Sequence, residues 1–220
     1  MSNSPISNPA RREGMLYVVS AASGAGKTSL LRALVERQPR IVLSVSYTTR
    51  PPRPGERDGV DYHFVDRRTF AAMGLREEWL ESAEVFGNKY GTSAACVDAL
   101  RAEGRDVVLE IDWQGAKMVR ERVPETRSIF ILPPSLEVLR SRLEGRGTDS
   151  PQAISRRLAA ARNETLHWRE YDYIVINAEF APALTALERI FAGQGEPWRR
   201  GRPGLGDFIA RLLAAGGVNA

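Results

Sequence analysis

The most constraining feature of the sequence is a glycine-bearing segment between an apolar run and a helical pattern. Residues 20–28 read SAASGAGKT, the apolar run MLYVV (15–19) precedes them, and SLLRALV (29–35) follows with helical spacing. A strand that turns directly into a helix brings successive backbone N–H groups and the positive end of the helix dipole to one point. The segment therefore predicts a strand–loop–helix unit with an anion-binding site.

The rest of the chain alternates strand-like apolar runs with helical patterns. The predicted strands are 15–20, 41–46, 106–111, 127–132 and 173–177. The predicted helices are about 26–37, 114–122, 135–145, 151–168 and 181–192. This order is typical of an α/β fold in which a parallel sheet carries helices on both faces.

One long stretch interrupts the alternation. Residues 47–95 begin with a segment rich in Pro, Gly and charge and continue with short aromatic pieces, which indicates an inserted small α+β lobe. The two ends of the chain also differ from the core. The expected parts are a flexible N-terminal segment 1–13, a core of 14–46 and 96–193, the lobe 47–95, and a C-terminal linker with a short helix, 194–220, the helix at about 207–214.

Composition narrows the class of protein. The 220 residues are 43% hydrophobic and contain one cysteine, Cys96, so no disulfide framework can form within the chain. No apolar run has the roughly 18 residues that a membrane span needs, and residues 1–14 lack the apolar centre of a secretory signal, so we expect a cytoplasmic protein. The net charge of +4 favours an anionic partner, which nucleic acid or a nucleotide would satisfy.

The glycine-bearing segment departs from the phosphate-loop pattern G-x-x-x-x-G-K-[ST] only at Ala21, where a negative φ would accommodate the methyl group. Lys27 would reach the β- and γ-phosphates, and the Thr28 hydroxyl would coordinate Mg²⁺ with the nucleotide. An ordinary tight turn with an exposed lysine is the plainer alternative, and the flanking strand and helix argue against it. The predicted ATP-binding loop comprises Ala21, Ala22, Ser23, Gly24, Ala25, Gly26, Lys27 and Thr28.

Five further blocks point to the second substrate. They read SYTTRPPRPGE (46–56), DGVDYHF (58–64), ESAEVFGNKYG (81–91), EIDWQG (110–115) and RLEGRGT (142–148). In order and spacing, these blocks closely resemble the signatures of the guanylate kinase family over roughly residues 14–193. The resemblance is to the bacterial type of these P-loop nucleoside monophosphate kinases. The resemblance implies that 47–95 binds GMP and that about 142–157 forms an arginine-bearing lid.

The resemblance also implies residues that bind the GMP phosphate. Arg50 and Arg53 match the arginines that hold this group, and a planar guanidinium suits it because it donates two parallel hydrogen bonds and keeps its charge. Tyr62 and Tyr90 match tyrosines that add hydroxyl donors. Alone, arginines in a Pro-rich loop would more simply be solvated surface charge.

Another implied group recognises the guanine base. Glu81 matches the carboxylate that accepts from guanine N1–H and the exocyclic amine together, a donor pair that adenine lacks. Ser46 and Thr92 would bond O6, and Asp112 would help hold the amine and the water shell of the metal. Glu110 is either a second acidic group of this kind or a structural residue.

The implied lid residues are Arg142, Arg146 and Arg157, which would close over ATP and neutralise charge on the transferred phosphoryl group. Asn177 matches an asparagine near the adenine, although the acidic residue that usually follows it is Ala178 here. No side chain is expected to act as a nucleophile. Arg156 and Arg162 are interpreted as helix-face charges.

These features predict an ATP-dependent kinase that converts GMP and ATP to GDP and ADP with Mg²⁺ as cofactor, in purine nucleotide metabolism. We expect no specific nucleic-acid partner and no membrane association, and a homo-oligomer stays open. Three alternatives remain at this stage: a kinase of the same fold with another acceptor, a catalytically silent module that binds a protein, and nucleic-acid binding through the arginines of the two tails.

Overall fold

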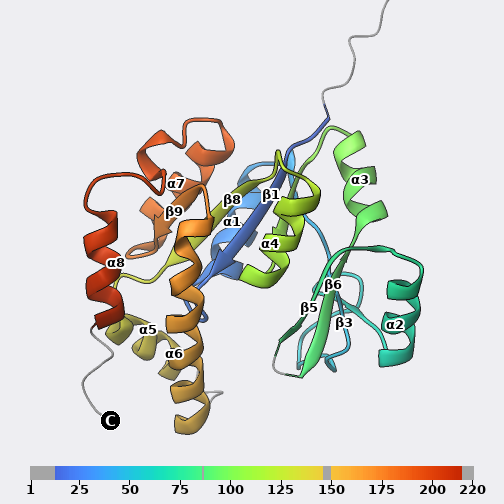
Figure 1. Cartoon of the computed structure of the whole chain (residues 1–220), viewed down its shortest axis with the longest axis horizontal. Coiled ribbons are helices and arrows are strands. Elements are labelled where there is room, and N and C mark those ends of the chain that lie inside the picture. The colour runs from blue at the N-terminus through green and yellow to red at the C-terminus, as the bar shows by residue number, and fades with distance from the viewer. Residues whose placement is uncertain (1–12, 86, 146–149, 215–220) are drawn as a thin grey trace, which may run out of the picture.

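The computed structural model describes residues 13–85, 87–145 and 150–214. A five-stranded sheet forms its centre (Figure 1), and every neighbouring pair of strands runs parallel in the order β2-β7-β1-β8-β9. The strands are β1 (Leu16–Ala21), β2 (Ile41–Leu43), β7 (Asp106–Glu110), β8 (Arg127–Leu132) and β9 (Tyr173–Ile176). The predicted α/β class with a parallel sheet is confirmed.

Side chains that alternate along each strand divide the core into two layers. In β1, Tyr17 and Val19 face one apolar cluster, whereas Leu16 and Val18 face the other. The first cluster is completed by buried residues of α1 (Lys27–Arg37), α5 (Leu136–Glu144), α6 (Pro151–Leu166) and α7 (Phe180–Phe191). The second receives residues of α3 (Ala94–Ala102), α4 (Trp113–Arg122), η1 (His167–Glu170) and α8 (Leu205–Ala214). Burial of apolar surface on both faces therefore holds the sheet at the centre of the molecule.

A second, smaller sheet lies to one side of the first (Figure 1). Its order is β4-β3-β6-β5, and it mixes one parallel with two antiparallel pairings. Its elements are β3 (Tyr47–Thr48), β4 (His63–Phe64), β5 (Trp79–Val85), β6 (Asn88–Ser93) and the covering helix α2 (Arg67–Leu75). Phe70 and Met73 of α2 pack with Trp79 in a small core of their own.

The predicted strand 41–46 is wrong at its C-terminal end. It stops at Leu43, and the chain then enters β3 of the second sheet at Tyr47. Residues 41–46 read IVLSVS, and the backbone N–H of Ser44 still donates to the carbonyl of Val108 at 3.0 Å, but the paired register with β7 covers only Ile41 to Leu43. Val45 and Ser46 therefore belong to the connection between the two sheets rather than to one continuous strand.

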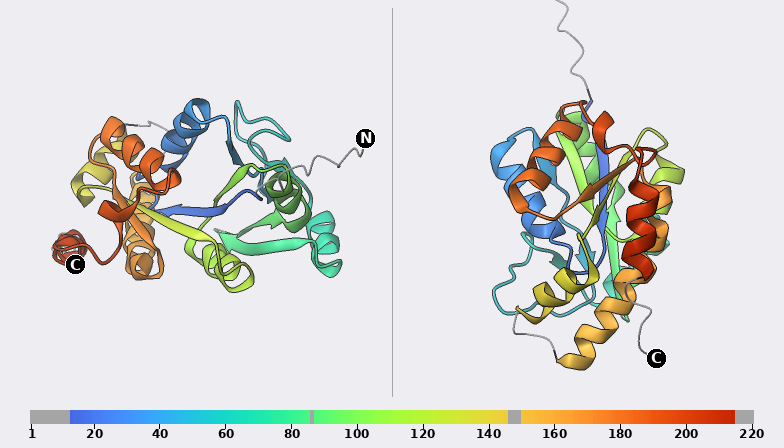
Figure 2. Two further views of the ribbon diagram at one scale, coloured as in Figure 1. Left: turned by 90° about the horizontal axis from the view of Figure 1, so that it is seen from above. Right: turned by 90° about the vertical axis from the view of Figure 1, so that its left-hand side faces the viewer.

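The C-terminal part of the chain packs on the parallel sheet. After η2 (Glu196–Trp198), Arg199 pairs antiparallel with Tyr173 of β9, and Arg202 donates to the carbonyl of Ile174 at 2.7 Å. Helix α8 then contributes Leu205, Ile209 and Leu212 to the second layer. Figure 2 shows α8 at the opposite end of the molecule from α2. None of the described helices combines the length and the hydropathy that a membrane span requires.

Candidate active site

The glycine-bearing segment forms a loop between β1 and α1. Gly24 and Gly26 have φ values of 88° and 93°, a left-handed backbone that favours glycine. A Cβ on Gly26 would also lie 2.6 Å from Nδ2 of Asn177. Ala21 is the last residue of β1 and pairs with Ile131, so its methyl group occupies an ordinary strand position. The departure at Ala21 therefore leaves the loop geometry intact.

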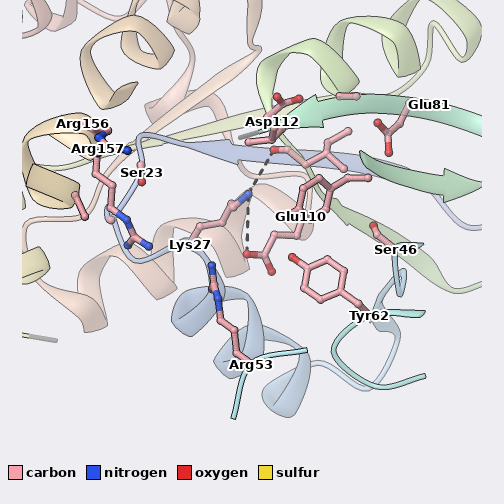
Figure 3. Close-up of a pocket in the computed structure, with 16 residues that line it drawn as sticks. Ser23, Lys27, Ser46, Arg53, Tyr62, Glu81, Glu110, Asp112, Arg156 and Arg157 are labelled. Carbon is pink, nitrogen blue, oxygen red and sulfur yellow. Dashed lines mark hydrogen bonds and ion pairs between the residues drawn. The ribbon is translucent and has the colours of Figure 1, made fainter. Parts of the chain in front are cut away.

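The first residues of α1 face an acidic strand end. Lys27 Nζ lies 3.4 Å from the carbonyl oxygen of Ile111, to which it donates, and 3.9 Å from Oε1 of Glu110 (Figure 3). Thr28 Oγ1 donates to the same Glu110 oxygen at 2.5 Å. This hydroxyl and carboxylate are the oxygen ligands that a hard divalent cation prefers. Among the described residues no group of three or more His, Cys, Asp or Glu could hold a metal ion.

A hollow of about 210 Å³ opens over this loop. Its lining includes one acidic group from the far part of the chain, Glu164 of α6, whose Oε2 accepts from the backbone N–H of Ser23 at 2.6 Å. Burial raises the pKa of the Glu164 carboxyl to about 7, and the nearby Lys27 opposes that increase. The loop residues lining the hollow are Ala21, Ala22, Ser23, Gly24, Ala25, Gly26, Lys27 and Thr28.

A larger cavity of about 530 Å³ connects the loop to the second sheet. Figure 3 shows Arg157 of α6 on one side of it, Ser46, Tyr62 and Glu81 on the other, and Lys27 between them. A neighbouring hollow of about 300 Å³ shares part of this lining and adds Arg50 and Thr28. The predicted site residues that line one or both are Ser23, Gly24, Lys27, Thr28, Ser46, Arg50, Arg53, Tyr62, Glu81, Tyr90, Asp112 and Arg157.

Glu81 is the most buried carboxylate of the cavity. Its residue is only 3% exposed, and its Oε1 accepts from the hydroxyl of Thr92 at 2.6 Å. Burial raises the pKa of Glu81 to about 7, although the bond from Thr92 favours the charged form. Thr92 is fully buried, and its hydroxyl lies 3.5 Å from that of Ser46. Three of the four residues predicted to recognise the base, Ser46, Thr92 and Glu81, therefore form one hydrogen-bonded chain.

Asp112 stands at the carboxyl end of β7, where it caps α4. Its Oδ1 accepts from the backbone N–H of Gly115 at 3.0 Å, and its Oδ2 accepts from the Gln114 side chain at 3.1 Å. In an open parallel sheet this edge is where ligands bind. These hydrogen bonds fix the Asp112 carboxylate, and Asp112 also lines the cavity.

The Pro-rich loop before β4 is held by an acidic residue that the sequence analysis missed. Glu56 binds Arg50 Nη2 at 2.8 Å through one oxygen and the backbone N–H of Arg53 at 2.7 Å through the other. The bond from Arg50 lowers the pKa of the Glu56 carboxyl. Arg50 also lies 5.4 Å from the ring centroid of Tyr62, which packs edge-on against Tyr90. All of these groups except Glu56 were predicted to meet one phosphate.

Several predicted residues do not line the cavity. Asn177 is buried against the loop, where its Nδ2 donates to the carbonyl of Ala25 at 2.7 Å. Arg142 donates to the carbonyls of Asn177 and Ala178 at 2.9 and 3.3 Å. Arg146 lies outside the described residues. The adenine and lid roles of these three therefore stay predictions.

Two further residues of α6 were assigned no site role from the sequence. Arg156, interpreted there as a helix-face charge, lines the larger cavity beside Arg157. Glu164 reaches the loop from 141 residues away, so no local motif could reveal it. Its position seven residues after Arg157 places both on one face of the helix, a signal that the sequence does contain.

A phosphate loop on a parallel sheet, facing a cavity with arginines and a buried carboxylate, defines the class of P-loop kinases that act on small acceptors. The family model described as guanylate kinase matches residues 13–194. The guanylate kinase of Alkalilimnicola ehrlichii is 56% identical over 91% of this chain and 98% of its own length. That of Pseudomonas fluorescens Pf-5 is 51% identical over 91% and 97%. The chain belongs to the guanylate kinase family.

A solved structure agrees with this assignment. The crystal structure of guanylate kinase from Anaplasma phagocytophilum superposes with a TM-score of 0.70 at 35% identity, covering 84% of this chain and 88% of that one. The family resemblance noted in the sequence is therefore confirmed.

Proposed function

We propose that this protein transfers the γ-phosphoryl group of ATP to GMP, producing ADP and GDP. The observation that carries the proposal is the single cavity that joins the phosphate loop to the buried Glu81. Two substrates held at its two ends would meet in the middle, beside Lys27 and Arg157. Membership of the guanylate kinase family supports the same reaction.

At the ATP end, backbone N–H groups of the loop would bind the β- and γ-phosphates. Lys27 would stay in contact with these phosphates in the transition state. Thr28 would be the protein ligand of the Mg²⁺ that accompanies ATP, and Glu110 would bind that ion or its water. When bound, this ion would supply positive charge that offsets the negative charge of the phosphates. The hydroxyl–carboxylate pair at 2.5 Å fits such an ion.

At the acceptor end, Arg50, Arg53, Tyr62 and Tyr90 would bind the GMP phosphate. Glu56 already orients the first of these groups, so little side-chain freedom would be lost on binding. Residues 47–95 would then act as the GMP-binding lobe and move with the acceptor as the cavity closes. Closure would exclude water, which would otherwise accept the phosphoryl group in place of GMP.

For the base, Glu81 would accept from guanine N1–H and the exocyclic amine, and Ser46 would donate to O6. Thr92 is the other predicted O6 contact, but it donates its single hydroxyl proton to Glu81. Adenine presents a bare acceptor at N1 and no 2-amino group, so the Glu81 carboxylate would receive no donor from the base. A buried polar group left unpaired in this way costs about 1–3 kcal/mol. Asp112 would add a second acceptor for the amine.

Arginines of α6 would complete the site. Arg157 would neutralise charge on the phosphoryl group as it moves between the two nucleotides, with Arg142 and Arg146 as further lid cations. No nucleophilic side chain is needed, because phosphoryl transfer requires positioning and electrostatic stabilisation. The acceptor oxygen of GMP attacks the γ-phosphorus, and ADP leaves.

A coupled assay of ADP release tests the proposal. ATP and Mg²⁺ are supplied with GMP, AMP, CMP, UMP or dTMP in separate reactions, with the wild type and with Glu81→Ala. We expect turnover with GMP and a large loss in the variant. Turnover of another monophosphate would favour a kinase with a different acceptor, and GMP binding without any turnover would favour the silent binding module.

A further inference from the structure

Gly115 lies between the two carboxylates that face the proposed guanine site. It is the third residue of α4, and its backbone N–H donates to Oδ1 of Asp112 at 3.0 Å. A Cβ built on it would lie 2.5 Å from Oε2 of Glu81 and 3.1 Å from the carboxyl carbon. A methyl group therefore has no room here unless Glu81 moves.

Glu81 has little freedom to move away. Its other oxygen is held by Thr92 at 2.6 Å, and the residue is 3% exposed. Helix α4 is itself fixed to β5, because Arg122 donates to the carbonyls of Trp79 and Leu80 at 2.5 and 2.8 Å. Neither Glu81 nor helix α4 is therefore free to move apart and make room for a side chain at position 115.

Helix stability gives no reason for glycine at this position. Glycine is a weaker helix former than alanine, and Gly115 is in a helix without a positive φ. The neighbouring carboxylate is the feature that a larger residue would disturb. The sequence block EIDWQG contains this glycine, but the roles assigned to that block end at Asp112.

We propose that Gly115 is a specificity-determining position, which acts by placing the carboxylates of Glu81 and Asp112 for the N1–H and 2-amino groups of guanine. Its backbone N–H holds one carboxylate, and its bare Cα leaves space for the other. The inference rests on the proposed function, since it assumes that Glu81 meets guanine. Gly115 is a positioning residue and contacts the base only through these two groups.

The test compares Gly115→Ala with Gly206→Ala, a change in the first turn of α8 where a Cβ meets nothing within 4 Å. Steady-state kinetics are measured with GMP and with inosine monophosphate, which lacks the 2-amino group. For Gly115→Ala we expect kcat/KM for GMP to fall by about tenfold or more, the preference for GMP over inosine monophosphate to shrink, and KM for ATP to stay within about twofold. Gly206→Ala should match the wild type in all three.

Adding Gly115→Ala to a second variant, Glu81→Asp, distinguishes the proposed contact from simple misfolding. Glu81→Asp shortens the carboxylate by one methylene group and relieves the contact, so Gly115→Ala added to it should cost about threefold or less. An additive loss in the double variant would overturn the inference, as would an unchanged preference for GMP in Gly115→Ala. If the wild type itself fails to phosphorylate GMP, the proposed function has failed, which is a different result.

Discussion

The phosphate loop and the pocket around Glu81 open into the same cavity, yet one is built from backbone groups and the other from side chains. The loop presents backbone N–H groups from consecutive residues, which two glycines with positive φ allow. The pocket relies on side chains from β5, β6 and the start of α4. Burial of the central carboxylate of this pocket, that of Glu81, raises the pKa of the group to about 7. Under the proposed function, one end would bind any triphosphate, whereas the other would distinguish bases.

Removing the loop lysine should cause the largest loss of activity. Lys27→Ala eliminates the cation next to the transferred group, and we expect kcat to fall by about a thousandfold with KM for GMP little changed. Lys117→Ala, an exposed lysine on α4, is the matched control and should retain full activity. Coupled-assay kinetics measure both, and a loss below about tenfold would contradict a role in the transition state.

A substitution in the pocket should alter the kinetic parameters for GMP and leave those for ATP unchanged. Glu81→Gln replaces one acceptor oxygen by an amide donor, so we expect kcat/KM for GMP to fall by about a hundredfold while KM for ATP stays unchanged. Glu84→Gln alters an exposed carboxylate on the same strand and serves as control. Equal losses for both substrates would mean that the two ends are not separate.

The raised pKa of Glu81 predicts opposite effects of pH on binding and on stability. In the proposed function GMP binds the ionised carboxylate, so kcat/KM for GMP should rise as pH increases towards about 7 and level off above it. The folded state binds this proton more tightly than the unfolded state does. The contribution of Glu81 to the free energy of unfolding should therefore fall as pH rises from about 4.5 to about 7.

Two controls identify the group responsible for the pH profile. Glu164→Gln removes the other carboxyl whose pKa is raised to about 7, and it should leave the rise with GMP in place. Glu81→Gln should leave only the ionisation of the GMP phosphate, near pH 6. If the full profile persists in Glu81→Gln, another group controls GMP binding.

The smallest effect on activity is expected far from the cavity. Ile209 of α8 is 1% exposed, and Ile209→Ala should lower the free energy of unfolding by about 2–4 kcal/mol. Because α8 lies away from both ends of the site, kcat and KM should stay near the wild-type values. Denaturant unfolding measures the first quantity, with the exposed Arg211→Ala as control.

The fold was largely predictable because the hydrophobic periodicity of each strand and helix is contained in its own segment of the sequence. The strand 127–132 and the helix at 181–192 were located within about one residue, since each is buried on a continuous apolar face. The strand 41–46 was too long because Val45 adds an apolar residue to the run after the paired register with β7 has ended. Periodicity shows which side chains are buried, and it does not show which strand they pair with.

The site was predictable where its residues are adjacent in sequence. Lys27 and Thr28 stand in one motif, whereas Glu164 contacts Ser23 across 141 residues and Glu56 acts through the fold of its loop. Gly115 was visible in a signature block, but its meaning depends on the approach of α4 to β5. Such contacts are products of tertiary packing. The spacing of Arg157 and Glu164 places both on one face of α6, but the sequence does not show that this face meets the loop.

A crystal structure with GMP and a non-hydrolysable ATP analogue tests the central claim most directly, because it locates both nucleotides in the cavity. The account predicts that guanine N1 and N2 lie at hydrogen-bond distance, about 2.7–3.2 Å, from the Glu81 carboxylate, with the γ-phosphate at Lys27. A guanine base bound away from Glu81, or a GMP phosphate held outside the reach of Arg50 and Arg53, would contradict it.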